Sequence, residues 1–99
     1  MAKGGTMRVK VVSVGETQTV GSNGFQKRLL EGMIEGEYPE NYQFEFVKDQ
    51  VTLLDNVLED TYVTVSYNLN GRKVVENKEG LPLDNPMFFT TLRGWKVEM

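Results

Sequence analysis

Apolar residues recur at every second position through most of this chain, and one short segment changes to a spacing of three and four. Alternation with period two is typical of half-buried β-strands. It is clearest at Tyr42, Phe44 and Phe46, which are separated by polar residues. In the segment 50–58 the spacing instead predicts a short amphipathic helix, with Asp49 as its N-cap. The pattern therefore predicts an all-β protein with a single short helix.

Five runs of residues have strand character, and polar segments rich in glycine and asparagine separate them. Two of these separating segments are long. We expect the first to be a flexible loop and the second to be a polar connection. The second of them leaves room for a short hairpin arm at Val74 and Val75. The predicted strands are 6–14, 25–34, 42–46, 61–69 and 87–97, and the two long loops are 15–24 and 70–86.

Three strands, one short helix and two further strands is the element order of the five-stranded oligonucleotide-binding (OB) barrel. In that fold the helix lies between the third and fourth strands, and ligands cross strands two and three between two long loops. At 99 residues the chain is below the size at which one core splits into several. We therefore expect one OB domain over residues 7–99, preceded by a flexible segment over residues 1–6.

The charges are unevenly distributed along the chain, although the net charge is -3 and the pI is about 4.9. Residues 1–30 contain five basic residues and one acidic residue, whereas residues 31–60 contain one basic and nine acidic residues. An OB barrel brings the first strand, both long loops and the last strand near one another, so its basic ends should line a common groove. A well-mixed solvated surface is the alternative that these counts leave open.

The sequence contains neither cysteine nor histidine, which excludes disulfides, thiolate nucleophiles, imidazole bases and the usual zinc ligands. Its carboxylates form no metal-binding run. No apolar run approaches the roughly 18 residues of a membrane span. We therefore expect a cytoplasmic protein with no enzymatic activity, no cofactor, no metal and no membrane partner.

Single-strand binding requires cations along the phosphates and exposed aromatic faces on which bases stack. Phe44 and Phe46 are predicted to belong to the core, and Tyr67 is expected to be buried. Trp95 could equally stack a base or seal the base of the barrel. The predicted nucleic-acid-binding residues are Arg8, Lys10, Phe25, Lys27, Arg28, Arg72, Lys73, Phe88, Arg93, Trp95 and Lys96.

The sequence also resembles a small bacterial and phage family of OB-fold single-stranded DNA-binding proteins, once catalogued as domain of unknown function 3127. The resemblance rests on NGFQK at 23–27, YP at 38–39, FEF at 44–46, VTVSYNLNGR at 63–72 and FTTLRGWKV at 89–97. It implies an OB barrel that acts on single-stranded DNA in replication, recombination or repair, in a bacterial cell or a phage-infected host. It also implies a homodimer or a larger homo-oligomer.

The leading hypothesis is therefore sequence-tolerant binding of single-stranded DNA. RNA or an oligosaccharide would use the same surface, and both stay open as ligands. The alternative function is a protein-interaction or assembly module that uses exposed sheet edges and binds no nucleic acid, and the acidic pI favours it.

Overall fold

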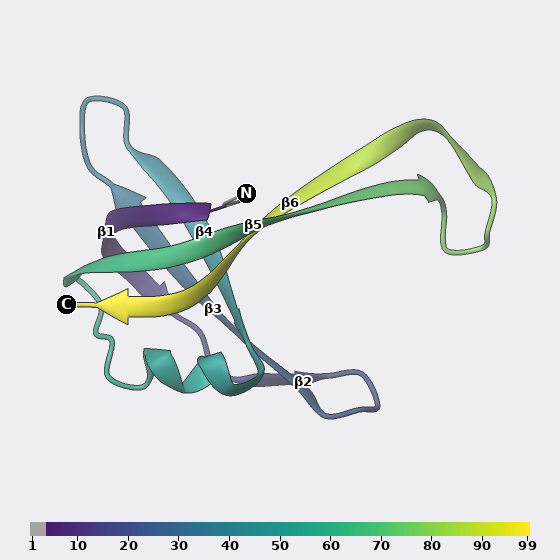
Figure 1. Ribbon diagram of the computed structural model, residues 1–99. Helices are drawn as coiled ribbons and strands as arrows, with labels where there is room; N and C mark the ends of the chain where they lie inside the picture. The colour runs from purple at the N-terminus through teal and green to yellow at the C-terminus, as the bar shows by residue number, and fades with distance from the viewer. Residues whose placement is uncertain (1–3) are drawn as a thin grey trace.

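The computed structural model describes residues 4–99, in which six strands and one short helix follow one another along the chain (Figure 1). This helix is too short to cross a membrane. The elements are β1 (Gly4–Val14), β2 (Gln18–Val20), β3 (Phe25–Ile34), β4 (Glu40–Val47), the 3-10 helix η1 (Lys48–Leu54), β5 (Tyr62–Glu76) and β6 (Pro82–Glu98).

Five of the strands close into a ring. β1 pairs with β5 and with β3, and a bulge between Val11 and Ser13 interrupts its pairing with β3. β5 pairs with β6 and β3 with β4, and the ring closes where β6 lies parallel to β4 at Phe44 and Glu45. β2 lies outside the ring and pairs only with β3. A closed ring with a short helix between its third and fourth strands is the OB barrel, so the predicted fold class is confirmed.

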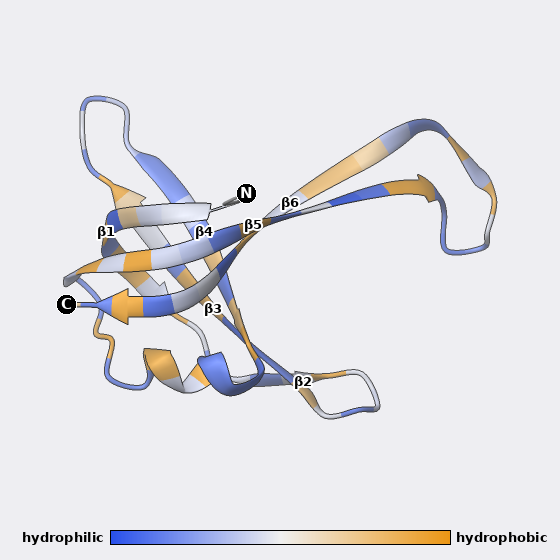
Figure 2. Cartoon of the chain, viewed as in Figure 1, coloured by the Kyte–Doolittle hydropathy of each residue, from blue (hydrophilic) through white to orange (hydrophobic). Residues whose placement is uncertain are grey.

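The core fills the inside of this ring. Alternation along β4 directs Phe44 and Phe46 inward, and both are fully buried, as the sequence predicted. Val9, Leu30 and Val63 pack in the same cluster. Figure 2 shows that apolar segments are interspersed with polar ones along the barrel strands. The same alternation directs the polar residues between the core positions to the outer surface of the barrel.

The helix is shorter than predicted and of a different type. η1 begins at Lys48 and is a 3-10 helix, whose three-residue turn places Val51 and Leu54 on its buried side. Val57 is buried as well but lies just after the turn that follows the helix. The predicted cap at Asp49 is wrong, because Val47 occupies the N-cap position and its side chain makes no capping hydrogen bond.

The segment 70–86, predicted as a long polar connection with room for a hairpin arm at Val74 and Val75, forms a β-ribbon. β5 continues to Glu76, and its pairing with β6 extends outward from the barrel to Val74 and Met87. We call residues 68–93 the β5–β6 arm, and Figure 1 shows it projecting far beyond the barrel. Asn77 shapes the turn, since its side-chain oxygen accepts hydrogen bonds from the backbone N–H groups of Glu79 and Leu81, both at 2.9 Å. Both faces of the arm border solvent, which removes the apolar alternation that would have signalled strands.

The segment 15–24 is also partly a hairpin. β2 pairs with the first residues of β3, and the tight turn between them uses the positive φ angles of Gly21 and Gly24. This β2–β3 hairpin and the β5–β6 arm leave the barrel toward the same side (Figure 1). At the N-terminus, β1 starts at Gly4 and pairs with β5 from there, so this part of the predicted flexible segment is a strand. Positions 1–3 of that segment lie outside the described residues.

Candidate nucleic-acid interface

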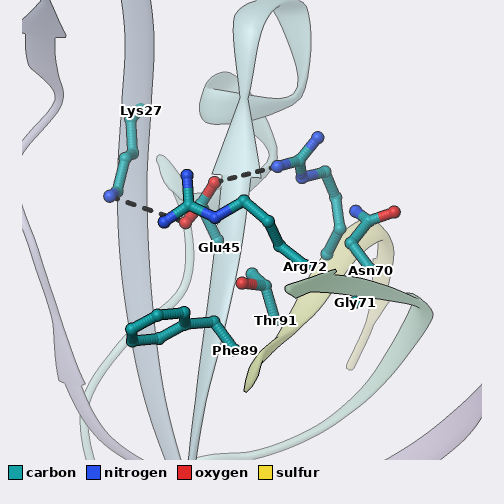
Figure 3. A pocket seen from close by; sticks show the side chains of 8 residues that line it. Lys27, Glu45, Asn70, Gly71, Arg72, Phe89 and Thr91 are labelled. Atoms are coloured by element: carbon teal, nitrogen blue, oxygen red, sulfur yellow. Dashed lines mark hydrogen bonds and ion pairs between the residues drawn. The ribbon is translucent and has the colours of Figure 1, made fainter. Parts of the chain in front are cut away.

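A partly buried carboxylate lies between two cations on the outer surface of β3, β4 and β6. Glu45 Oε2 is 3.5 Å from Lys27 Nζ, and its Oε1 is 3.2 Å from Arg93 Nη2 (Figure 3). Its side chain is only 18% exposed. Within residues 4–99 the Nε atom of Arg93 is buried and has no hydrogen-bond partner. Lys27 and Arg93 are therefore brought together as predicted, but the acidic Glu45 lies between them.

One face of the β5–β6 arm continues this surface. Arg72 is paired with Phe89 across the arm, and Asn70 with Thr91, so alternation places all four side chains on the same face. The guanidinium carbon of Arg72 lies 5.5 Å from the centroid of the Phe89 ring, which is a cation–π contact. The arm and the barrel together border a half-open pocket of about 520 Å³, which we call the groove pocket. Its lining residues are Lys27, Glu45, Asn70, Gly71, Arg72, Phe89, Thr91 and Arg93.

The opposite face of the arm carries a second cation–aromatic pair. Lys73 and Phe88 face each other across the two strands, with the ammonium nitrogen 5.9 Å from the ring centroid. Phe88 is 72% exposed. Because successive residues of a strand point to opposite faces, neither side chain lines the groove pocket.

The protein-family models and solved structures can now be compared with this geometry. The family model described as "Domain of unknown function (DUF3127)" matches residues 6–98. The chain belongs to this family. The family inferred from the sequence motifs is thereby confirmed. No curated protein matches the sequence.

Two solved structures share the fold of the DUF3127 chain at low sequence identity. One is the crystal structure of the SSB domain of a protein from Synechococcus sp., with 14% identity and a TM-score of 0.72, covering 100% of this chain and 97% of that chain. The other is the mitochondrial single-stranded DNA-binding protein Rim1 from S. cerevisiae, with 11% identity and a TM-score of 0.73, covering 100% and 95%. Both likenesses show the OB fold of this DUF3127 protein.

The side chain of Arg28 in the DUF3127 barrel makes structural contacts at the end of the ring where η1 lies. Its Nε donates to the Gly15 carbonyl oxygen at 2.7 Å, and its Nη1 donates to the Val51 carbonyl oxygen at 3.2 Å. The same Nη1 is 2.8 Å from Asp55 Oδ1. The side chain of Arg28 is only 16% exposed. It therefore joins β3 to η1 and to the end of β1, on the opposite side of the strand from Lys27.

Replacing Arg28 with methionine should lower stability and leave nucleic-acid affinity unchanged. Methionine keeps most of the volume but leaves the carbonyl groups of Gly15 and Val51 without their donor. We expect a loss of about 2 kcal/mol, a typical value for hydrogen bonds to a charged group. Thermal unfolding followed by circular dichroism should show a melting temperature lower by roughly 8 to 16 °C. A large loss of oligonucleotide affinity in the folded variant would contradict this assignment.

Four other predicted residues lie on a second surface, formed by β1, β5 and β6. Arg8 and Lys10 point outward from β1, and Arg8 Nη1 donates to Thr64 Oγ1 at 3.3 Å. Lys96 lies 3.4 Å from Glu98. Trp95 is the extra residue of a bulge in β6 and is 49% exposed, so it does not seal the barrel. The DUF3127 fold therefore does not bring these residues into the groove pocket.

Phe25 lies at the base of the β2–β3 hairpin and is partly buried. Together with Lys48 and Asp49 it borders a shallow pocket of about 600 Å³. Phe25 and Lys27 are two positions apart on β3 and point to the same side. This pocket therefore extends the surface of the groove pocket toward the β2–β3 hairpin.

The acidic middle segment lies mostly away from the groove pocket. Tyr42 donates to Glu40 Oε1 at 2.9 Å, and Tyr62 donates to the Glu35 carboxylate. These hydrogen bonds raise the pKa of both phenols, because an ionised tyrosine would lose the bond and repel the carboxylate. Within residues 4–99 no group of three acidic side chains lies close enough to hold a metal ion. Glu45 is the exception, because its side chain lines the groove pocket.

Sequence reasoning missed five residues of the groove pocket: Glu45, Asn70, Gly71, Phe89 and Thr91. Phe89 and Thr91 share the alternation of Arg93, at spacings of four and two, and that signal was available in the sequence. Asn70 and Glu45 required the strand register, because their partners are 21 and 48 positions away.

Proposed function

We propose that this protein binds single-stranded DNA in the groove pocket without strong dependence on sequence. The observation that carries the proposal is the Arg72–Phe89 pair, which places a cation and an aromatic face together on the wall of a pocket over β3 and β4. These are the second and third strands of the barrel, where OB folds bind oligonucleotides. Two of the solved structures that share the fold are described as an SSB domain and as a single-stranded DNA-binding protein, which supports the same proposal.

In this proposal an unpaired base stacks on Phe89, and Arg72 contacts the neighbouring phosphate. Stacking on an aromatic ring tolerates every base, because every base has a π-face. Phe25 offers a second aromatic ring at the other end of the surface, beside Lys48. Lys73 and Phe88 would hold a longer strand that passes around the arm. The remaining predicted cations, Arg8, Lys10 and Lys96, would add long-range attraction without lining the pocket.

The proposal extends to the cellular role. We infer a non-enzymatic protein of the bacterial cytoplasm or of a phage-infected host, acting in DNA replication, recombination or repair without metal or cofactor. We further infer that it self-associates, since Met87 and Phe88 leave apolar surface exposed on the arm.

A protein-interaction module is the second candidate function, because β2 offers a strand edge that is paired on one side only. RNA stays open as a ligand of the same surface. Titrations with DNA, RNA and duplex of equal length distinguish these possibilities, since an interaction module would bind none of them.

Substituting Phe89 with alanine should weaken the binding of fluorescently labelled oligo-dT. The loss of one stacked base costs on the order of 1 to 3 kcal/mol, or about 5- to 150-fold in the dissociation constant. Fluorescence anisotropy at low salt measures this change. The affinity of the wild-type protein should also fall with salt, with a log–log slope near -0.7 per phosphate neutralised.

Phe88→Ala is the matched control, because it removes the same ring from the opposite face of the arm. A short oligomer that occupies only the groove pocket should bind this variant nearly as well as the wild type. Equal losses in the two variants would contradict the placement of the strand, and unchanged binding by Phe89→Ala would contradict stacking in the pocket.

A further inference from the structure

The position of Glu45 indicates which part of a nucleotide meets the barrel. A carboxylate repels phosphate, and this one is largely buried beneath the groove pocket. It also offsets one of the two positive charges of Lys27 and Arg93, the cations that it contacts. The phosphates of a bound strand should therefore follow Arg72 on the arm, and the base edges should face Glu45. This orientation rests on the proposed function: the bound strand turns its bases toward the barrel and its phosphates toward the arm.

The hydrogen-bonding capacity of Glu45 is only half used. A carboxylate has about four acceptor sites, two on each oxygen. Arg93 occupies one site on Oε1 with a hydrogen bond, whereas Lys27 lies 3.5 Å from Oε2 as an ion pair and uses at most one further site. One acceptor site on each oxygen is thus open toward the pocket, between two cations that can themselves donate to a ligand. A ligand that complements this arrangement has two adjacent hydrogen-bond donors for Glu45 and, next to them, a hydrogen-bond acceptor for the cations.

Among the DNA bases, guanine alone has two adjacent donors on its Watson–Crick edge. Its N1–H and N2–H₂ groups lie side by side, and its O6 acceptor is next to them. Cytosine and adenine each offer one amino group there, and thymine offers a single N–H. Proteins commonly read single-stranded bases through this edge while the base stacks on an aromatic ring. We propose that the groove pocket selects guanine, with Glu45 as its acceptor, at one position of an otherwise sequence-tolerant strand.

The other residues of the pocket suit this role. Phe89 offers the stacking face, so a base stacked on it can present its edge toward the barrel. Lys27 and Arg93 flank the carboxylate and can donate to O6, while Glu45 accepts from N1–H and N2–H₂. The cavity of about 520 Å³ is in the usual size range for small-molecule sites, which accommodates a base.

Anisotropy titrations with four matched oligomers test the inference. Each is a dT strand of about 15 nucleotides with isolated guanine, adenine, cytosine or hypoxanthine at roughly every fifth position, which avoids guanine quartets. Hypoxanthine keeps O6 and N1–H but lacks the N2 amino group. The guanine strand should bind at least about fivefold more tightly than all-dT, which is the lower bound for one good base contact. The hypoxanthine strand should lose most of that preference.

Two protein variants assign the preference to the carboxylate. E45Q should abolish the guanine preference, because an amide offers one oxygen in place of two and directs donors at the base. Its affinity for all-dT should rise, since the positive charges of Lys27 and Arg93 are no longer partly offset. E31Q removes one charge from the outward side of the same strand pair, outside the pocket, and should keep the preference.

The outcomes separate the two levels of the proposal. Tight binding of all-dT with no guanine preference in the wild type would overturn base selection and leave single-strand binding intact. Equal binding of guanine and hypoxanthine strands, or a preference that survives in E45Q, would overturn the role of Glu45. Failure of the wild-type protein to bind any of the strands would overturn the proposed function and, with it, this inference.

Discussion

Replacing both Arg72 and Lys73 with glutamate should reduce the affinity for oligo-dT by about 100-fold at low salt. Each substitution removes a cation that faces an aromatic ring on the arm, and each adds a charge that repels phosphate. We estimate about 1.4 kcal/mol, or a factor of ten, for each position. The log–log salt slope should also become shallower by roughly 0.7 per lost phosphate contact. Anisotropy titrations across a series of salt concentrations measure both quantities.

The double reversal of Arg8 and Lys10 is the matched control. It changes the net charge by the same amount, but its residues lie on the outer face of β1 and not in the groove pocket. We expect it to weaken binding far less than the arm variant does. If the two variants lost affinity equally, binding would depend on overall charge, and the proposed location of the interface would be wrong.

Gly94→Ala should be among the most destabilising single substitutions in the barrel. A Cβ atom at this position would overlap the ring of Phe46, which is fully buried. The close-packed core cannot make room without moving β4 or β6 at their point of closure. We expect a loss of about 3 kcal/mol, at the upper end of overpacking effects. The melting temperature should fall by roughly 12 to 24 °C in calorimetry or circular dichroism.

Gly71→Ala makes the same chemical change where there is space. No atom lies within 4 Å of a Cβ built at Gly71, because that residue lies on the exposed arm. Its melting temperature should stay within a few degrees of the wild type. A similar fall in both variants would show that the close contact between Gly94 and Phe46 is unimportant for stability.

The barrel could be predicted from the sequence because its strands have one buried face. Phe44 and Phe46 alternate with polar residues since every second side chain of β4 enters the core. The arm has no such constraint, and its strands therefore resembled a polar loop. The helix was recognised by its spacing, but Val51 and Leu54 are three apart, which suits a 3-10 turn as well as an α-helix.

Residues of the candidate site could be predicted from the sequence only where their place in the site does not depend on the register between strands. Lys27 and Arg72 were predicted from their positions at the two long loops, and Arg93 from its place on the last strand. The structure brings the three residues to one pocket. Lys27 and Arg28 looked equivalent in the sequence. Alternation along β3 places Lys27 on the outer surface beside Glu45 and Arg28 at the end of the ring where η1 lies. Composition cannot reveal that Glu45 lies among the basic residues, because cross-strand pairing alone brings it there.

The unbroken pairing of the β5–β6 arm affects the thermodynamics of association. Its ladder continues the barrel wall from Tyr67 and Gly94 out to Val74 and Met87, so the arm is preorganised before any ligand arrives. A segment that folds on binding must lose conformational entropy at that moment, and this loss reduces affinity. The described arm avoids most of that cost. The conformational entropy lost on binding would then come chiefly from the flexible polynucleotide.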